Sequence, residues 1–417
     1  MAPEHDAVAE TIRIEGARIL ATLIRTVGDV QLAEDAVQEA TLAALRAWPA
    51  HGVPPEPRAW LTVTARRKAI DMLRRERVRP QKERDGLQMS DLMGSELPPE
   101  RVVQDDLLRL IFTCCHPTLS PTTRVALALR TLCGLAPAQI AGVLLTNEAA
   151  TTKRLTRARQ KIAAARIPYK VPTAQELPAR LPAVCGVIHS LYTAGHAPLD
   201  GRSAVDVDAC TEAVRLAELL HELLPDEPLP AAVLSLLLLT EARRPARLDE
   251  RGEVVTLEEQ DRGRWDAAAI SRGIALLNDS LRRTDGQADA FQLQAAIAAE
   301  HARSGRYADT DWVEVLRLYE LLVSVAPSTA AALGRAVAAA EAVDAATGLE
   351  LLAELPPGPR WHAVRAELLA REGRYAEAAE ELADSLEGPS TQPERRHRER
   401  RRRAFLRLAM PTPPVQT

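Results

Sequence analysis

The sequence predicts an all-α protein. Hydrophobic residues make up 46% of the 417 residues but aromatic residues only 3%, so the cores must be built from alanine and aliphatic side chains. Long stretches consist mainly of Ala, Glu, Leu and Arg, which are strong helix formers. No stretch shows the sustained alternation of β-branched residues that a half-buried strand requires. The length exceeds that of one compact domain, so we expect several.

Composition and motifs exclude several functional classes. No run of about 18 apolar residues is present, so we expect no membrane span. The acidic start, residues 1–6, lacks the apolar segment of a signal peptide. Five cysteines without disulfide or metal spacing are typical of a reducing cytoplasm, where we expect the protein to act. Because no phosphate-binding loop, dinucleotide fingerprint or nucleophile elbow is present, we expect no catalytic residues, cofactor or metal.

The net charge of −4 is unevenly distributed along the chain. Residues 1–170 contain 25 Lys and Arg against 19 Asp and Glu, whereas residues 171–417 contain 28 against 38. A basic front and an acidic back indicate separate roles. We therefore expect nucleic acid to bind the front part.

The front part begins with three predicted helices. Residues 10–48 form two amphipathic helices, which Gly28 separates and Pro49 ends. Residues 49–57 are a Pro-rich loop, and the absence of Gly and Pro from 58–77 predicts a third helix there.

A linker and a second group of helices follow. Residues 79–104 collect prolines and glycines among mixed charges and predict the linker. Helices resume at Asp105 and continue, with breaks at Pro117 and Gly134, to about Ile167.

The most specific local pattern lies at 135–163. Pro137 predicts the start of a helix, Thr146-Asn147 a short turn with an N-cap, and Glu148 the start of a second helix. The predicted inward face of that second helix is Leu155, Ala158 and Ile162, and its outward face is Lys153, Arg154, Arg157 and Lys161. A helix, a tight turn and a basic helix form a helix-turn-helix whose second helix fits a major groove.

The charge of this segment supports the same interpretation. Residues 149–170 hold seven Lys and Arg and no acid, an excess that phosphate binding requires. The alternative is a solvated basic helix in an ordinary bundle.

Residues 58–84 form a second basic element, with ten Lys and Arg against three acids. Val63, Ile70 and Leu73 are its expected apolar seam. Such a helix suits a DNA backbone, and the alternative is a solvated charged face.

Residues 32–45 predict a helix with two different faces. The inward residues are Ala33, Ala36, Val37, Ala40 and Ala44, and the outward stripe is Asp35, Gln38, Glu39 and Leu42. The stripe could dock a partner helix, or the segment is an ordinary amphipathic surface helix.

The order of these pieces resembles bacterial sigma factors of the extracytoplasmic-function group, which keep only the second and fourth sigma regions. The segments AEDAVQEATLAAL, WLTVTARRKAIDMLRRERVR and KRLTRARQKI carry the likeness, in that order. Residues 10–78 resemble the second region and 105–166 the fourth. FTCCHPTLSPTTRVALALRTLCGL and LEEQDRGRWDAAAISRGIALL resemble one subgroup, which has a long helical C-terminal extension of tetratricopeptide character.

The resemblance implies core RNA polymerase and promoter DNA as partners. It implies that the stripe Asp35, Gln38, Glu39 and Leu42 binds the coiled coil of the polymerase β′ subunit, and that the fourth region meets the β flap. It implies −10 reading by Arg66, Arg67, Lys68, Asp71, Arg74 and Arg75, and −35 reading by Thr151, Thr152, Lys153, Arg154, Arg157 and Lys161. Loop 49–57 matches the place where a flipped base is held, but only Trp48 and Trp60 border it as aromatics.

We therefore expect four segments: a sigma second region at 1–78, a linker at 79–104, a helix-turn-helix fourth region at 105–168 and a helical array at 173–410. Within the array, Gly305 and Gly373 follow similar helical segments, each before Arg-Tyr, and predict left-handed helix C-caps. We expect helices over Leu181–Leu191, Val207–Leu224, Ala231–Glu241, Trp265–Leu281, Ala288–Ser304, Trp312–Val325, Ala330–Val343 and Trp361–Leu386.

Three further features have simpler interpretations. Cys114-Cys115-His116 is expected in the core rather than on zinc, because too few ligands lie nearby. His189, His196 and residues 200–202 are expected in or near a solvated turn. Eight arginines between Arg395 and Arg407 predict a last helix docked on the acidic array rather than a nucleic-acid arm.

The function expected from the sequence is that of a sigma factor. Its extension would modulate activity, either by packing on a sigma domain or by binding a regulatory protein. Two rival functions remain: a helical scaffold without polymerase binding, and an operator-binding regulator that recognises duplex DNA without polymerase.

Overall fold

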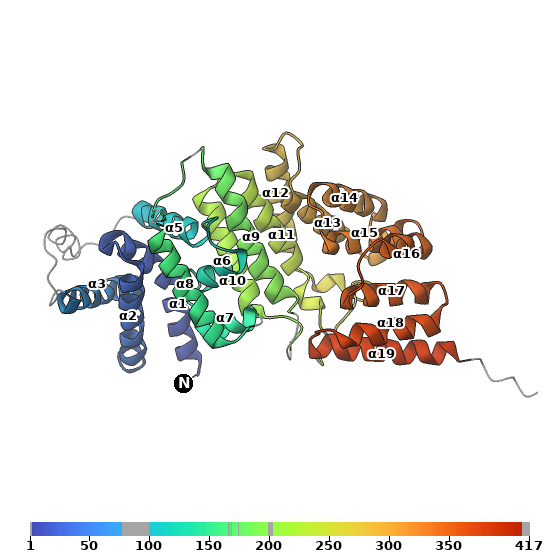
Figure 1. Cartoon of the computed structure of the whole chain (residues 1–417), viewed down its shortest axis with the longest axis horizontal. Coiled ribbons are helices and arrows are strands. Elements are labelled where there is room, and N and C mark those ends of the chain that lie inside the picture. The colour runs from blue at the N-terminus through green and yellow to red at the C-terminus, as the bar shows by residue number, and fades with distance from the viewer. Residues whose placement is uncertain are drawn as a thin grey trace, which may run out of the picture. The chain divides into compact units, whose positions relative to one another are not determined.

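The computed structural model describes residues 2–76 and 100–410, apart from residues 145, 166, 168, 174 and 199–202. The described residues form α-helices and short 3-10 turns (Figure 1), with an isolated β-bridge between Leu248 and Val254. The prediction of an all-α protein is confirmed. The chain divides into two compact units, Met1–Ser190 and Leu191–Thr417. Each described helix is too short or too polar to cross a bilayer.

Three helices open the first unit: α1 (Ala2–Val27), α2 (Val30–His51) and α3 (Pro57–Glu76), which pack on one another. Gly28 adopts a φ of 73°, which ends α1, and the Asp29 carboxylate caps α2 by accepting from the Leu32 amide at 2.9 Å. Small side chains let α2 approach its neighbours closely. Ala33, Ala36, Ala40 and Ala44 are all buried, as the sequence predicts, while Val37 is half-buried.

Two predicted boundaries in this part were wrong. Helix α2 continues through Pro49 to His51, because Gly52, with a φ of 80°, forms the C-cap and its amide bonds to the Trp48 carbonyl at 2.8 Å. Helix α5 begins at Glu100 rather than Asp105. The rest of the predicted linker, residues 79–99, lies outside the described residues.

The second group of helices in this unit is α5 (Glu100–Cys114), α6 (Pro121–Thr131), α7 (Pro137–Val143) and α8 (Glu148–Ala164). Helix α5 packs on α1, and α8 packs on both α6 and α7. Leu127, Leu129, Ile140 and Leu155 fill the space between them. Helix α9 (Leu177–His196) begins in this unit and ends in the next.

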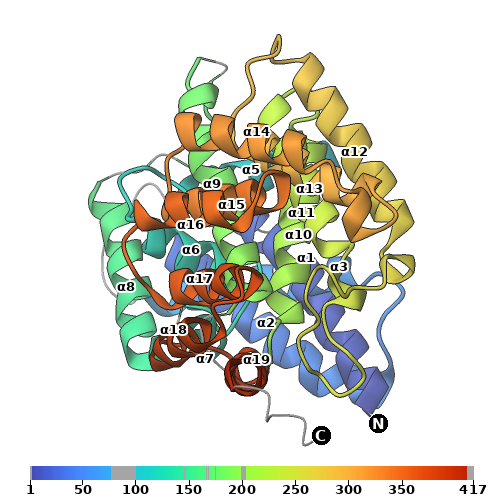
Figure 2. The same cartoon turned by 90° about the vertical axis from the view of Figure 1, so that its right-hand side faces the viewer.

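The second unit is an array in which consecutive helices pack as hairpins, with α17, α18 and α19 stacked in successive rows (Figure 2). This is the arrangement of tetratricopeptide-like arrays. Its helices are α10 (Val207–Leu223), α11 (Pro228–Glu241), α12 (Ala267–Arg282), α13 (Ala290–Arg303), α14 (Trp312–Val325), α15 (Thr329–Ala342), α16 (Ala345–Ala353), α17 (Pro359–Arg371), α18 (Tyr375–Glu387) and α19 (Gln392–Ala409).

Helix α11 forms the centre of the array's first half. Every residue from Pro230 to Leu239 is buried, and the helix packs on α10, α12 and α13. A helix that is apolar all round must be enclosed on all sides. Further along, Leu293, Ile297, Val315 and Leu322 build the core between α13 and α14.

The two glycines predicted as left-handed caps differ. Gly373, between α17 and α18, has a φ of 75° and confirms its prediction. The prediction for Gly305 was wrong, because Ser304, the C-cap that follows α13, is extended and Gly305 has no positive φ. The Ser304 hydroxyl instead bonds the Glu300 carbonyl at 3.2 Å and so ends the helix without a left-handed residue.

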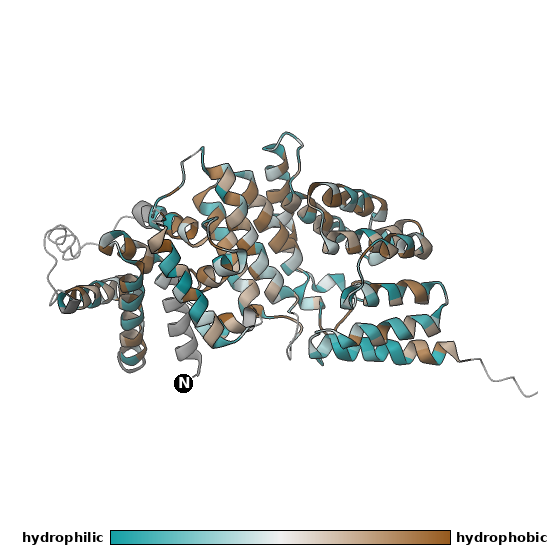
Figure 3. Ribbon diagram, viewed as in Figure 1, coloured by the Kyte–Doolittle hydropathy of each residue, from teal (hydrophilic) through white to brown (hydrophobic). Residues whose placement is uncertain are grey.

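The arginine-rich segment forms α19, which is teal over most of its length in Figure 3. Its one large buried apolar side chain is Phe405, which packs among α17 and α18 residues. Arg396 and Arg400 both pair with Glu253, and Arg401 pairs with Glu367. The prediction of a last helix docked on the array is confirmed.

Substitution of Gly348 in α16 tests how closely the helices of the array pack. A Cβ added at Gly348 would lie 2.9 Å from the Ala336 carbonyl oxygen and 2.8 Å from the Ala340 Cβ. We predict that Gly348→Ala lowers the free energy of unfolding by about 1–3 kcal/mol, measured by urea denaturation. Gly186→Ala in α9 is the control: nothing lies within 4 Å of its added Cβ, so it should leave stability unchanged or raise it. Equal stability of Gly348→Ala and the parent would contradict this packing.

Candidate functional site

Helix α8 divides its residues between a buried and an exposed face. Asn147 caps it by accepting from the Ala150 amide at 2.8 Å, so the predicted turn and N-cap are confirmed. Leu155, Ala158 and Ile162 are buried, also as predicted. Of the residues predicted for the −35 element, Thr152, Lys153, Arg157 and Lys161 are exposed, and Arg154 is half-buried.

A hollow of about 410 Å³ lies between this exposed face and the start of α6. Its lining includes the four basic residues Lys153, Arg154, Arg157 and Lys161, with Ser120 and Thr123 opposite. Ser120 is the N-cap of α6, and its hydroxyl accepts from the Thr123 amide at 3.4 Å. Basic side chains beside a helix N-terminus suit a phosphate group.

Two residues of α8 lie on its inward side in addition to the three predicted there. Thr151 is fully buried and belongs to the inward face of α8, so it is not among the residues that can face a DNA groove. Arg159, which the sequence did not single out, turns inward and pairs with Glu34 of α2. A basic residue one position beyond the apolar face could have been recognised only with knowledge of this distant acid.

Helix α3 presents basic residues at helical spacing. Arg67, Asp71 and Arg74 are exposed, whereas Arg66 and Lys68 are half-buried. Burial and the nearby Arg25 lower the pKa of Arg66. The side chain of Arg75 lies outside the described residues.

The predicted apolar seam of α3 needs correction. Val63, Ile70 and Leu73 are only half-buried, and the residues that face the core are Leu61, Ala65 and Ala69. Small alanines at a spacing of four let α3 lie close to α2. The bulkier residues are left at the border of the contact.

The loop after α2 is shorter than predicted, because the helix extends to His51. Its bordering aromatic residues pack on each other: the rings of Trp48 and Trp60 lie 5.5 Å apart, nearly edge to face. Trp48 is buried, so it is not free to stack on a base.

The stripe on α2 is largely accessible. Gln38, Glu39 and Leu42 are exposed, with 45% of Leu42 accessible, and Asp35 is half-buried. Lys68 of α3 reaches Glu39 at 3.4 Å, and Gln31 donates to Asp35 at 3.0 Å. The structure therefore brings one residue predicted for DNA beside one predicted for polymerase.

Gln38 and Leu42 also line a cavity of about 540 Å³. Its other wall comes from α6, α7 and the turn between them, with Arg130, Leu135 and Gln139. The second group of helices thus faces one side of the stripe.

In the comparisons with known proteins, each of the two groups of helices in the first unit matches its own family model. Residues 12–79 match the model of Sigma-70 region 2, residues 109–162 that of Sigma-70 region 4, and residues 180–281 a family of unknown function, DUF6596. A probable ECF RNA polymerase sigma factor, SigI of Mycobacterium tuberculosis, is 35% identical over 176 residues, which span 41% of this chain and 60% of that protein. The chain belongs to the bacterial extracytoplasmic-function sigma factors.

The likeness to one relative extends beyond the sigma regions. An uncharacterized protein of Rhizobium meliloti is 39% identical over 372 residues, which cover 86% of each chain. The sigma factor therefore shares its long C-terminal extension with that protein. A structure of yeast Tom70 aligns with 92% of this chain and 82% of its own, at 12% identity and a TM-score of 0.38.

Two buried carboxylates connect the helix groups within the first unit of this sigma factor. Glu34 of α2 pairs with Arg159 of α8, and Asp106 of α5 accepts from Arg25 of α1 at 2.9 Å. Burial raises the pKa of both carboxyl groups, and the arginines oppose that rise. Tyr169 adds a third connection, since its hydroxyl bonds the Ala21 carbonyl at 2.8 Å and the Asp106 carbonyl at 3.1 Å.

The cysteine pair of the sigma factor lies in the core, as predicted. Cys114 and Cys115 are both buried, and burial raises the pKa of Cys115 to about 12, so it stays a thiol. His116 instead shares a hydrogen bond with the Thr118 hydroxyl at 2.8 Å.

The predicted solvated turn near His196 was wrong for the residues described. Helix α9 continues to His196, whose ring stacks on Tyr192 at 5.3 Å. Arg247 donates to the His196 carbonyl at 2.7 Å. Residues 200–202 lie outside the described residues.

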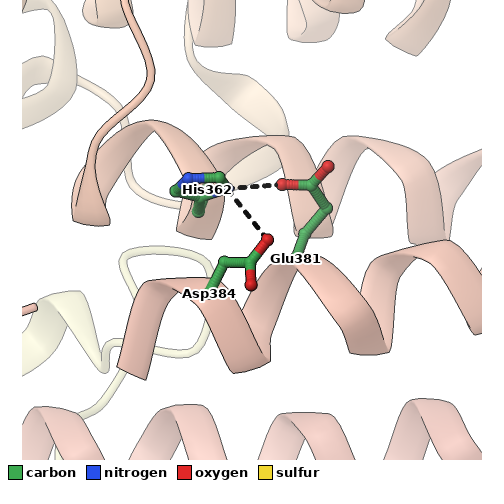
Figure 4. A group of neighbouring side chains, drawn as sticks. All are labelled: His362, Glu381 and Asp384. Atoms are coloured by element: carbon green, nitrogen blue, oxygen red, sulfur yellow. Dashed lines mark hydrogen bonds and ion pairs between the residues drawn. The ribbon is translucent and has the colours of Figure 1, made fainter. Parts of the chain in front are cut away.

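One group of side chains in the described residues has a spacing that suits a metal ion: His362, Glu381 and Asp384, on α17 and α18 (Figure 4). His362 Nδ1 lies 2.7 Å from Glu381 and 4.0 Å from Asp384. Arg365 also donates to Glu381 at 2.7 Å, and a guanidinium in this place disfavours a cation. We interpret the group as a polar connection across the α17–α18 hairpin.

The Glu34–Arg159 pair yields a stability prediction. Arg159→Ala leaves a buried carboxylate without its partner, and we expect a loss of about 3 kcal/mol in the free energy of unfolding at pH 7.5. The loss should shrink as the pH falls, because the raised pKa of Glu34 lets protonation favour the folded state, a contribution that disappears as the pH rises through that pKa. Urea denaturation at several pH values measures both effects.

The control for this prediction is Arg157→Ala, which removes the same side chain from the exposed face of α8. It should change stability by less than about 0.5 kcal/mol. Glu34→Gln added to Arg159→Ala should restore part of the lost stability. An Arg159→Ala variant as stable as the control at every pH would contradict a buried ion pair.

Proposed function

We propose that this sigma factor binds core RNA polymerase through α2, recognises two promoter elements through α3 and α8, and is modulated by its helical array. The observation that carries the proposal is the separation of faces on α8. Its apolar residues and Arg159 point inward, which leaves an outward face of Thr152, Lys153, Arg157 and Lys161. A basic face on the second helix of a helix-turn-helix is the expected surface for a major groove.

For the −35 element, we propose that Lys153, Arg154, Arg157 and Lys161 bind phosphates and base edges, with Thr152 beside them. The hollow between α8 and the start of α6 supports a phosphate there, because four basic side chains line it. Arginine can also bind guanine edges with two hydrogen bonds. Thr151 is left out, since it is buried.

For the −10 element, we propose that the exposed face of α3, with Arg67, Asp71 and Arg74, contacts the melted strand. Arg66, Lys68 and Arg75 belong to the same proposed element. A groove for single-stranded DNA needs positive charge along the backbone path.

For polymerase, we propose that Asp35, Gln38, Glu39 and Leu42 bind the β′ coiled coil, and that the fourth region meets the β flap. An apolar Leu42 beside acidic and amide groups suits a helical partner with basic flanks. The wall formed by α6 and α7 restricts this surface on one side. We propose that polymerase binding moves the two helix groups apart and breaks the Glu34–Arg159 pair.

The array is proposed to modulate these activities, through a sigma domain or through a regulatory protein that it binds. Hairpin arrays form extended surfaces for protein partners. The acidic charge of residues 171–417, with 38 Asp and Glu against 28 Lys and Arg, suits a basic surface.

The polymerase surface is tested by Asp35→Ala combined with Glu39→Ala. We predict that the double variant binds core RNA polymerase roughly tenfold more weakly or worse, because its acidic groups can no longer contact the coiled coil. Binding to duplex DNA should be unchanged. Affinity for core polymerase is measured by fluorescence anisotropy of labelled protein.

The matched control removes two exposed acids of the array, Glu250→Ala with Glu258→Ala, and should bind polymerase like the parent. If both double variants bind equally, α2 does not carry the polymerase surface. If the parent binds no polymerase at all, the helical scaffold and the operator-binding regulator become the better interpretations.

Removal of the array tests modulation. We predict that a chain ending at Ser190, where the first unit ends, gives promoter-dependent transcription that differs several-fold from that of the full chain. This end point keeps Tyr169 and keeps Arg180, which donates to the Phe112 carbonyl at 2.8 Å. Circular dichroism verifies that the fragment is helical. Equal output from both chains would contradict a modulating array.

A further inference from the structure

Three enclosed arginines in the array lack an acidic partner. Elsewhere in this unit arginines pair with acids, for example Arg272 with Glu218 and Arg371 with Glu341. For Arg243, Arg247 and Arg262, no carboxylate oxygen in the described part of the chain lies within 4.0 Å of a side-chain nitrogen. The acid on the same stretch, Glu241, is instead bound by Arg244 and by the Tyr192 hydroxyl.

Two of the three arginines have other roles. Arg262 donates to the His301 carbonyl at 2.6 Å and to the Ser304 carbonyl at 2.7 Å, and so fixes the end of α13. Arg247 donates to the carbonyl of His196 and to its ring nitrogen at 2.7 and 3.1 Å. These bonds use neutral acceptors, so carboxylates act on the two charges only at longer range: Glu241 and Glu394 on Arg247, and Asp309 on Arg262.

Arg243 differs, because its side chain makes no hydrogen bond in the described structure. Its guanidinium lies over the ring of Trp265, 5.3 Å from the centroid. The Arg262 guanidinium lies 4.8 Å from the centroid of the same ring. The indole therefore holds the two cations near each other without neutralising either.

The surroundings of Trp265 contain several buried nitrogens without partners. They are Arg243 Nε, Arg262 Nε, Trp265 Nε1 and His301 Nδ1. A buried donor without an acceptor costs about 1–3 kcal/mol, so several in one place point to an acceptor that binds there. Three of the four are N–H donors whatever the histidine tautomer.

The electrostatics agree with this geometry. Burial, with Arg247 and Arg262 nearby, lowers the pKa of Arg243 to about 10, so it remains charged at pH 7. Burial with Arg243 and Arg262 lowers the pKa of His301 to about 4, which keeps that ring neutral. Three like charges thus repel each other in a partly enclosed place, and an anion would stabilise all three.

We propose that this cluster is a binding site for a small oxyanion, a phosphate or carboxylate group, with Arg243 as its principal ligand. The Trp265 ring positions the guanidinium, and its indole N–H and His301 lie beside it as further polar groups. A planar guanidinium with free N–H groups fits both oxyanions through two parallel hydrogen bonds. The proposal does not depend on the sigma function of the first unit.

The experiment compares thermal unfolding of the full chain in chloride, inorganic phosphate and acetate at equal ionic strength and pH 7.5. We expect phosphate or acetate to raise the unfolding midpoint by a few degrees in a saturable way. The arm that saturates at lower concentration identifies the preferred oxyanion. Arg243→Met should lose this shift and, in chloride, unfold at a higher temperature than the parent, because an uncompensated charge is removed.

The matched control is Arg264→Met, an exposed arginine one residue before Trp265, which should keep the full shift. If Arg243→Met does not fold, Arg243→Lys keeps the charge but loses the planar fork, and calorimetry should then show roughly tenfold weaker anion binding. A shift retained in Arg243→Met or Arg243→Lys would mean an adventitious ion only. Absence of any shift in the parent would mean that water satisfies these donors, and either result overturns the proposal.

Discussion

The burial of two carboxylates, Glu34 and Asp106, constrains the whole first unit. Neither group could remain ionised in this interior without a cation, because desolvation disfavours its charge by several kcal/mol. Arg159 therefore turns inward from α8 to Glu34, while Arg25 of α1 and Arg109 of α5 both pair with Asp106. Once Arg159 is held inside, the rotation of α8 about its own axis is set as well. The other basic residues of α8 then lie on its outward face. The surface proposed for DNA is thus a consequence of where one arginine is needed inside.

The same constraint connects DNA and polymerase recognition. The pair Glu34–Arg159 joins the helix that carries the proposed polymerase stripe to the helix proposed to read the −35 element. A cavity of about 540 Å³ lies between the stripe and the wall formed by α6 and α7, and it is too small for a pair of helices. Binding of the coiled coil and separation of the two helix groups would then be one coupled event, with the ion pair setting part of its free-energy cost.

Local sequence signals predicted much of this structure, and the failures share a physical origin. The Asn147 cap, the turn before it and the inward residues Leu155, Ala158 and Ile162 follow from periodicity and capping, which act within a few residues. Arg159 was not singled out, because its orientation depends on Glu34 of α2, more than a hundred residues away. The seam of α3 was misjudged because close packing selected alanines rather than the larger apolar residues. The missing partners of Arg243 are likewise a tertiary property, since Glu241 lies two residues away and binds elsewhere.

The most direct test of the central claim is transcription in vitro with sigma-free core RNA polymerase. Purified full-length chain is added to fragmented DNA of the source genome, and transcript starts are mapped. A sigma factor with two promoter-reading helices predicts starts that depend on the added chain and share two upstream sequence elements at a fixed spacing. Starts without common elements, or no starts from either the full chain or the fragment ending at Ser190, would contradict it.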